Sequence, residues 1–316
     1  MFGNEIAVLI PCYNEEKTIG KVVCDFRRQL PNAQIYVYNN NSTDNTYAEA
    51  KAAGAIVRNE HRQGKGFVVR RMFADIDADI YLMVDGDDTY DAKAAPKMID
   101  AVITDGLDFV NGLRQETTIA AYRFGHRFGN RLLTTMIQKF FGDQYNDILS
   151  GLKAFSRRFV KSFPITAGGF EIETELVIHA LELQMPGKEI EVAYKNRPPG
   201  SYSKLNTIAE GIKISRMIVD MVKHERPLLV FTIIGVVLIL SSVLLAYPLF
   251  VTYFKTGLVP RFPTAILCSA ITIMGFLSFI CGLILDTVTR GRQETKRMFY
   301  LSIQRKPSSN HEKKSV

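Results

Sequence analysis

The sequence predicts an α/β domain with a mainly parallel sheet, followed by two membrane-spanning helices. Through about the first two hundred residues, short apolar runs of strand length alternate with helix-length segments. This rhythm is typical of a parallel sheet with helices on both faces. Further along the chain, two long apolar stretches hold almost no charge. At 316 residues the chain has room for one large domain and a smaller part.

The expected elements of the α/β domain follow one another from the N-terminus. Strands are predicted at Ile6–Ile10, Gln34–Tyr38, Ala55–Arg58, Ile80–Val84 and Phe109–Arg114. Helices are predicted at Glu15–Leu30, Asn45–Ala53 and Gly66–Asp77. Because open sheets of this kind bind ligands beyond the carboxyl ends of their strands, functional residues are expected directly after these runs.

The two apolar stretches, Leu228–Phe250 and Thr264–Leu285, each have the length of a helix that crosses a bilayer core of about 30 Å. Two buried core helices are the alternative, but core helices of this length rarely lack a polar stripe. The connector Val251–Pro263 is short, which predicts a hairpin. Basic residues are denser on the outer flanks than in the connector, so the positive-inside rule predicts a cytoplasmic N-terminal domain and a cytoplasmic tail.

The chain is therefore expected to have four parts. They are the α/β domain (1–204), a juxtamembrane amphipathic helix (205–226), the membrane hairpin (227–289) and a cytoplasmic tail (290–316). Apolar residues recur at helical spacing among basic ones in the juxtamembrane segment. This pattern suits a helix in the membrane interface, although a helix packed on the soluble domain would show it too. The polar end of the tail is expected to be disordered.

Composition excludes several classes of protein. Hydrophobic residues make up 47% and charged residues 22% of the chain, so neither a disordered protein nor a fully embedded transporter fits. The net charge of +7 comes without a basic repeat or a recognisable nucleic-acid reader, so a membrane surface or phosphorylated ligands explain it better than nucleic acid. The four cysteines lack zinc-like spacing and are expected to be free thiols. The N-terminus has no basic region of the kind that opens a cleaved signal peptide.

Polar loops follow the first two predicted strands, at Pro11–Glu16 and Asn39–Thr46. Each could be only a turn before a helix, with Ser42 or Thr43 as the N-cap. Because both loops lie at the same edge of the predicted sheet, their side chains could instead grip a base and a ribose.

An acidic segment, Asp85–Asp91, follows the strand that ends at Val84. Residues two apart in extended chain point the same way, so Asp85 and Asp87 can present carboxylates to one site while Gly86 lets a ligand come close. Hard oxygen ligands suit Mg²⁺ or Mn²⁺ carrying a diphosphate. The alternative is an acidic turn that caps the next helix, but four carboxylates in seven residues repel one another unless a cation is present.

Basic residues indicate sites for anions. Lys65, flanked by glycines at the start of a predicted helix, could help to hold a phosphate, although its surroundings match neither a P-loop nor a dinucleotide fingerprint. The other candidates are Arg114, Arg123, Arg127, Arg131, Arg197 and Lys204. Three of these residues, Arg123, Arg127 and Arg131, recur every four residues along one face of a predicted helix, and such a face is usually solvated. The position of this face before a membrane hairpin and near an acidic segment favours a site for a lipid phosphate.

Seven short motifs occur in a fixed order before the two spans: IPCYNEE, NNNSTDNT, GKG, DGD, GLR, DILSGLK and RPPGSYSK. Over residues 5–290 the chain thereby resembles the family 2 glycosyltransferases that make polyprenyl-phosphate sugars, such as dolichyl-phosphate mannose synthases and bacterial polyprenyl-phosphate glucosyl and N-acetylglucosaminyl transferases. The resemblance implies a GT-A fold, Mg²⁺ or Mn²⁺, a nucleotide-sugar donor and a polyprenyl phosphate acceptor. It also implies an integral protein of a bacterial or archaeal plasma membrane that serves cell-surface glycan or glycoprotein assembly.

The resemblance assigns roles to individual residues. Pro11, Tyr13 and Glu15 would contact the nucleotide, and Asn40 would stand where an acidic contact to base or ribose is usual. With their neighbours, the expected donor-binding residues are Pro11, Tyr13, Asn14, Glu15, Asn40, Ser42, Lys65, Asp85 and Gly86. Asp85 and Asp87 would be the metal motif. The phosphate-binding positions would be Arg114, Arg127, Arg197 and Lys204.

Departures from the family pattern bear on the donor. Asn39 and Asn40 replace the usual acidic pair, and Thr89 stands where mannose synthases tend to have a glutamine metal ligand. One extra residue lies between Gly200 and Lys204, which bears on the register of Ser201, Ser203 and Lys204 and not on the donor. UDP-glucose or UDP-N-acetylglucosamine is therefore the expected donor, and a GDP-mannose-dependent mannose synthase is the alternative.

Two further readings and two residue roles stay open. A processive polysaccharide synthase would resemble its relatives in a Q-x-x-R-W motif, but this chain has no tryptophan. An inactive membrane adaptor that binds nucleotide sugar is the alternative of another class, and the intact aspartates argue against it. Glu171 and Glu173 either bind sugar hydroxyls or are first-turn helix residues. Asp147 could order an arginine. The resemblance also implies a possible homo-oligomer, because the family often assembles through its membrane segments.

Overall fold

A computed structural model of the chain describes residues 5–116, 134–139, 142–164, 171–198, 223 and 226–304. The chain forms two compact units, one made of Met1–Ile214 and Lys296–Val316 and the other of Ser215–Thr295. The expected juxtamembrane helix at 205–226 lies almost wholly outside the described residues, as does the polar end of the tail from 305 to 316.

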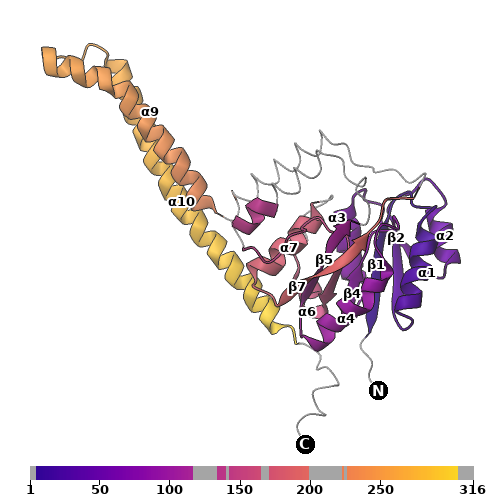
Figure 1. Cartoon of the computed structure of the whole chain (residues 1–316). Helices are drawn as coiled ribbons and strands as arrows, with labels where there is room; N and C mark the ends of the chain where they lie inside the picture. The colour runs from indigo at the N-terminus through magenta and orange to yellow at the C-terminus, as the bar shows by residue number, and fades with distance from the viewer. Residues whose placement is uncertain are drawn as a thin grey trace, which may run out of the picture. The chain divides into compact units, whose positions relative to one another are not determined.

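The first unit contains a seven-stranded sheet with the strand order β3-β2-β1-β4-β6-β5-β7 (Figure 1). Its strands are β1 (Ile6–Cys12), β2 (Gln34–Asn39), β3 (Ile56–Asn59), β4 (Ile80–Met83), β5 (Phe109–Glu116), β6 (Lys153–Ser156) and β7 (Gly187–Tyr194). Strands β1 to β4 pair in parallel, as do β5 and β7, whereas β6 runs antiparallel to both of its neighbours. The predicted mainly parallel sheet is confirmed, with β6 as its reversed strand.

Helices cover both faces of the sheet. They are α1 (Ile19–Gln29), α2 (Thr46–Ala52), α3 (Lys65–Asp75), the short 3₁₀ helix η1 (Ala92–Ala94), α4 (Ala95–Thr104), α6 (Arg157–Ser162) and α7 (Ile172–Glu182). Helix α1 contacts α2, η1 and α4, while α3 contacts α7. These two groups form the two helical layers of the domain.

The core lies between the central strands and these helices. Every residue of β4 is buried, because helices cover both of its faces. Val8, Ile10 and Leu82 of the sheet pack with Val23 of α1 and Met98 of α4, and none of these five is more than 4% exposed. Each such side chain contributes roughly 1.5–3 kcal/mol when fully buried. The rigid sheet fixes the strand ends from which the polar loops depart.

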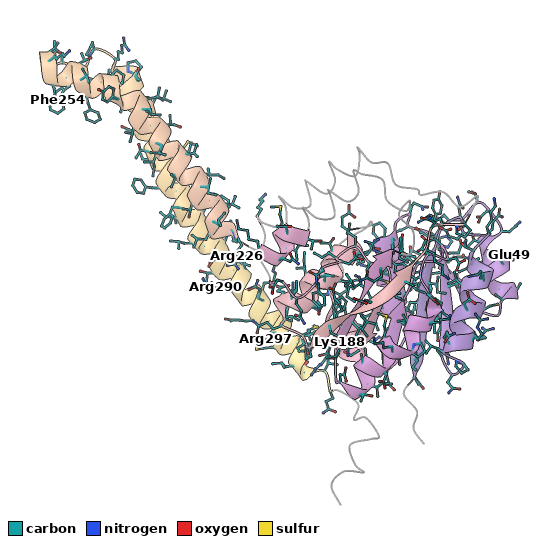
Figure 2. All side chains as sticks on the ribbon, in the orientation of Figure 1. Glu49, Lys188, Arg226, Phe254, Arg290 and Arg297 are labelled. Carbon is teal, nitrogen blue, oxygen red and sulfur yellow. The ribbon has the colours of Figure 1, made fainter. Side chains whose placement is uncertain are left out.

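The second unit contains the apolar helices, α9 (Pro227–Thr256) and the greater part of α10 (Phe262–Ser302). Both helices are long and apolar enough to cross a membrane, judged by length and composition. They pack closely at glycines, since a methyl group added to Gly235 would lie 2.8 Å from the Gly275 carbonyl oxygen. Phe254, labelled near one end of the hairpin in Figure 2, is 81% exposed. The two expected apolar helices are therefore present.

Helix α10 continues well beyond Leu285, where the second span was expected to end, and reaches Ser302. Its polar part includes an Asp286–Arg290 ion pair of 2.9 Å at the helical spacing that stabilises exposed helix. The last turns, from Lys296 onward, belong to the first unit. There the Tyr300 hydroxyl donates to buried Asp108, so this part of the expected tail is ordered against the α/β domain.

Candidate active site

The polar loops after β1 and β2 are joined to each other by hydrogen bonds. The Asn14 amide donates to Ser42 Oγ (2.9 Å), and the Glu15 amide donates to Thr46 Oγ1 (2.8 Å). Asn14 adopts a left-handed backbone with φ of 52°, and its Oδ1 accepts from the Thr43 amide at 2.8 Å. Helix α1 begins at Ile19 and not at Glu15 as predicted, after a turn in which the Thr18 and Ile19 amides donate to the Glu15 carbonyl oxygen (3.1 and 2.9 Å). The two loops form one rim at the carboxyl edge of the sheet.

Four predicted donor-binding residues lie on the β1 side of this rim, and Ser42 lies on its β2 side. The four are Pro11 in the last part of β1, Tyr13, Asn14 and Glu15. Tyr13 is 37% exposed, which suits a ring that receives a ligand. Ser42 and Thr43 do not cap α2, because its N-cap is Asn45 and the Thr46 amide donates to Asp44 Oδ1 (3.0 Å). The capping alternative was therefore wrong for these two residues.

Asn40 is buried and fastens the loop that leads into α3. Its Nδ2 donates to the carbonyl oxygens of Glu60 (2.9 Å) and Arg62 (2.7 Å), and its Oδ1 accepts from the Gly64 amide (2.8 Å). Lys65, the next residue, begins α3. In this structure Asn40 therefore helps to place Lys65, while its contact with a base or ribose stays a prediction.

Lys65 joins two carboxylates that are far apart in the sequence. Its Nζ donates to Asp85 Oδ1 (2.5 Å) and also forms an ion pair with Glu173 Oε1. Burial acts to lower the pKa of Lys65, but the charges of Asp85 and Glu173 outweigh it and the pKa is raised. The ammonium therefore stays charged within this cluster.

Asp87 is 3% exposed and is held from two sides. Its Oδ1 accepts from Thr89 Oγ1 (2.6 Å), and its Oδ2 pairs with Arg197 Nη2 (2.6 Å). Burial, followed by the charge of Asp85, raises the pKa of Asp87 against the opposing effect of Arg197. For Asp85, burial acts to raise the pKa, but Lys65 lowers it more strongly and the net pKa is lowered. The two carboxylates are thus close enough to repel each other electrostatically.

Two glycines shape the surroundings of this aspartate pair. A methyl group added to Gly86 would lie 2.7 Å from Cys12 Sγ, so packing against β1 requires this glycine. The sequence had suggested a different reason, the approach of a ligand. A methyl group added to Gly151 would lie 2.6 Å from Asp85 Cγ. Sequence reasoning did not select Gly151, although it belongs to the DILSGLK motif.

Arg114, at the end of β5, is held by Asp147. Its Nε and Nη2 donate to Asp147 Oδ2 and Oδ1, both at 2.6 Å, and its guanidinium lies 5.3 Å from the centre of the Tyr194 ring. The hypothesis that Asp147 orders an arginine is confirmed. Arg114 also contributes to the lowered pKa of Asp85, which places its charge near the aspartate pair. The remaining basic candidates, Arg123, Arg127, Arg131 and Lys204, lie outside the described residues.

The Lys65–Glu173 ion pair was not predicted. Glu173 lies in the first turn of α7, as one alternative held, but it is also buried against Lys65. Burial, followed by the charge of Asp85, raises the pKa of Glu173 in spite of Lys65. Glu171 is the N-cap residue of α7, without a capping hydrogen bond from its side chain. The Glu173 carboxylate, beside Lys65 and Asp85, is suited to accept hydrogen bonds from hydroxyl groups, so the alternative that it binds a sugar stays a prediction.

The aspartate pair fits a divalent cation that takes its other oxygens from a ligand. In the described part of the chain, no group of three or more His, Cys, Asp or Glu side chains could hold a metal by itself. Asp85 and Asp87 interact electrostatically, and two protein cations, Lys65 and Arg197, now neutralise them. Divalent Mg²⁺ and Mn²⁺ commonly bind through one or two carboxylates plus phosphate oxygens.

A mainly parallel α/β sheet with polar loops and paired aspartates beyond the carboxyl ends of its central strands is typical of nucleotide-binding proteins, which hold the ligand at that edge. The chain belongs to glycosyl transferase family 2, whose profile matches residues 7–163. It is 35% identical over 232 residues to the glycosyltransferase AglJ of Haloferax volcanii, covering 73% of this chain and 76% of that protein. It is 28% identical over 223 residues to a dolichyl-phosphate hexose transferase of the same organism, covering 71% and 96% of the two chains.

A solved structure supports the fold. Glucosyl-3-phosphoglycerate synthase from Mycobacterium tuberculosis, in complex with Mn²⁺, uridine diphosphate and glucosyl-3-phosphoglycerate, superposes with a TM-score of 0.56 at 22% identity. The match covers 70% of this chain and 79% of that one. The GT-A fold and the glycosyltransferase class predicted from the sequence are confirmed.

Proposed function

We propose that this enzyme transfers a sugar from a nucleotide-sugar, a UDP-hexose or UDP-N-acetylhexosamine, to a polyprenyl phosphate in a membrane. The observation that carries the proposal is the convergence of Asp85 and Asp87 with Lys65, Arg197 and Arg114 at one edge of the sheet. The dolichyl-phosphate hexose transferase relative and the two apolar helices support a lipid acceptor.

The donor would bind along the rim formed by the loops after β1 and β2. Tyr13 offers an exposed ring to the base, and the polar groups of Asn14 and Ser42 lie beside it. The diphosphate would then reach the aspartate pair at the end of β4. A divalent cation held by Asp85 and Asp87 would supply the charge that neutralises the departing nucleoside diphosphate.

The acceptor needs little activation by the protein. A lipid monophosphate has a second pKa near ~6, so at pH 7 it is largely a dianion and already nucleophilic. Its oxygen forms a bond to the anomeric carbon while the bond from that carbon to the diphosphate oxygen breaks, and the electron pair leaves with the nucleoside diphosphate. This single displacement inverts the anomeric carbon. It requires no catalytic base.

The protein must instead bring two anions together in line. Arg114 and Arg197 are suited to bind phosphate, since a guanidinium donates in a fork that matches its oxygens. Asp147 holds the Arg114 guanidinium with two hydrogen bonds, which limits its motion. Such alignment of bound partners can lower the barrier to a displacement by about 7–11 kcal/mol. Arg127 and Lys204 would complete the phosphate site.

The cell context of the proposal follows from the apolar helices. Helices α9 and α10 would anchor the enzyme in a plasma membrane, with the catalytic domain on the cytoplasmic side where nucleotide-sugars are made. A homo-oligomer formed through these helices is part of the same proposal. The lipid chain would be undecaprenyl or dolichyl.

The proposal is tested with the full-length protein in detergent or in vesicles. UDP-glucose, UDP-N-acetylglucosamine and GDP-mannose are each incubated with undecaprenyl or dolichyl phosphate and Mn²⁺, and the extracted lipid is identified by mass spectrometry. A lipid heavier by one hexose or N-acetylhexosamine with a UDP donor is the expected result. A product only with GDP-mannose selects the mannose synthase, and transfer to a soluble acceptor but never to lipid would refute the proposal.

A further inference from the structure

Lys153, the first residue of β6, is an unusual residue for the middle of a sheet. It is 0% exposed and lies between β4 and β5, where it pairs with Met83 and Asn111. Moving an ammonium group out of water costs several kcal/mol unless charges or hydrogen bonds compensate it. Within the described residues, Lys153 forms no ion pair at salt-bridge distance. A buried cation of this kind calls for an explanation beyond packing.

The hydrogen-bond acceptors of the Lys153 ammonium are two neutral oxygen atoms, and the centre of the Phe109 ring lies 5.8 Å away. Nζ donates to Asn111 Oδ1 (2.6 Å) and to the Ile148 carbonyl oxygen (3.3 Å). Burial lowers the pKa of Lys153 to about 8, while the more distant charges of Glu173 and Asp147 act to raise it. The group is thus still mainly charged at pH 7.

An ammonium group can only donate hydrogen bonds, so Asn111 turns its oxygen toward Lys153, in agreement with the two acceptors on the other side of the amide. With Oδ1 turned toward Lys153, Nδ2 must face the other way. It donates to the Asp147 carbonyl oxygen (2.8 Å) and to Glu189 Oε1 (2.9 Å). Glu189 Oε1 in turn accepts from the Asp147 amide (3.1 Å). The backbone of Asp147 is therefore held at both its N–H and its carbonyl group.

Asp147 is the residue that orients Arg114. Its two carboxylate oxygens accept from Arg114 Nε and Nη2, and Oδ2 also accepts from the Arg114 backbone amide (3.2 Å). A continuous chain of hydrogen bonds thus leads from Lys153 through Asn111 and Asp147 to Arg114.

We propose that Lys153 is a positioning residue that acts through Asn111 and Asp147 to hold Arg114 in the orientation that meets the acceptor phosphate. The inference rests on the proposed function of Arg114, and it assigns a role to a lysine that is fully enclosed in the sheet. A methionine at this position would leave Asn111 Oδ1 and the Ile148 carbonyl oxygen buried without their donor, so the strand and the loop that carry them would shift. The loop would move away, and Arg114 with it.

The test compares Lys153→Met, Arg114→Ala and the double variant in full-length protein, with initial rates measured against lipid phosphate and against donor. Lys153→Met is expected to lower kcat/KM for the lipid phosphate by about tenfold or more, since a misplacement of about 1 Å can cost about a hundredfold. The KM for the donor should stay within about twofold. Lys161→Met is the matched control, because this α6 lysine donates to the Phe73 and Ile76 carbonyl oxygens and pairs with Asp77 (3.6 Å), away from Asn111, Asp147 and Arg114.

The double variant separates positioning from a general structural role. If Lys153 acts through Arg114, adding Lys153→Met to Arg114→Ala should cost less than about threefold more. Losses that multiply in the double variant, or an equal loss toward donor and acceptor, would overturn the inference. If Lys153→Met does not fold, Asn111→Asp replaces it. That variant keeps an oxygen toward Lys153 but removes the donor to Asp147, and the same acceptor-specific loss is expected.

Failure of the inference can be told apart from failure of the proposed function. If Arg114→Ala itself leaves the use of lipid phosphate unchanged, the proposed role of Arg114 is wrong and the role of Lys153 falls with it. If Arg114→Ala impairs use of the acceptor while Lys153→Met and Asn111→Asp do not, only the positioning role is refuted.

Discussion

Gly151→Ala is expected to disable the enzyme without unfolding it. The added methyl carbon would lie 2.6 Å from Asp85 Cγ, whereas two carbon atoms in contact prefer about 3.5–4.0 Å. The Asp85 carboxyl group must therefore move by about 1 Å. Gly151 also donates its amide to the Tyr90 hydroxyl (2.6 Å), so the backbone at this point is tied to the domain and resists a compensating shift.

A displacement of about 1 Å at a catalytic group can cost about a hundredfold in rate, so kcat for sugar transfer should fall by about that factor. The assay is the radiolabelled transfer of sugar into extractable lipid at saturating donor and Mn²⁺, with the melting temperature measured on the same sample. Gly20→Ala in α1 is the matched control, because its nearest atom, Glu49 Oε2, is 3.9 Å away. Full activity in Gly151→Ala would refute the assignment of Asp85 to the reacting site.

Three further outcomes are expected. Asp87→Ala should abolish metal-dependent transfer while the protein remains folded and membrane-bound, and undiminished activity would remove this carboxylate from the mechanism. Burial, with Lys296 nearby, lowers the pKa of His179 to about 3, whereas an unfolded histidine titrates near 6.5. The unfolded state therefore binds the extra proton, and stability should be lost as pH falls below 6.5, by up to about 1.4 kcal/mol per pH unit. His179→Gln should flatten the melting temperature between pH 6.5 and 5, and an unchanged slope would contradict this. Tyr300→Phe should destabilise the protein by about 1–3 kcal/mol, because buried Asp108 loses a donor, and an unaltered melting curve would show that this contact is not formed.

The order of the first five strands and of the helices between them could be predicted because apolar runs of strand length alternate with helical periods. Strand β6 and its direction were not predicted. All four of its residues are buried, so the short run Lys153–Ser156 carries neither an alternating pattern nor any sign of its direction. The lysine that opens this run even argues against a central strand. Its acceptors, Asn111 and Ile148, come from another strand and from a loop, so they become visible only in three dimensions.

In the candidate site too, residues close together in the sequence could be predicted, whereas contacts between residues far apart in the sequence could not. Asp85 and Asp87 were predictable because they directly follow a strand at the carboxyl edge of the sheet, although Gly86 and Asp87 form a turn and not the extended chain assumed from the sequence. The Lys65–Glu173 ion pair joins residues 108 positions apart, and no local pattern relates them. The clamp between Arg114 and Asp147, 33 positions apart, was suggested only as one possible use of the aspartate. Spacing rules therefore identify the ends of strands but not the charges that gather around them.

The acidic segment was first linked to a metal because its carboxylates should repel one another. The structure weakens that argument, since the protein supplies its own compensation. Asp88 pairs with Lys21 (2.6 Å), and Asp91 accepts a hydrogen bond from the Lys93 amide at the start of η1. Of the four aspartates in this segment, Asp85 and Asp87 form the candidate metal site. Asp85 already pairs with Lys65, and Asp87 already pairs with Arg197. The case for a metal therefore depends on their place at the end of a central strand, where a diphosphate would add the negative charge that Lys65 and Arg197 alone do not balance.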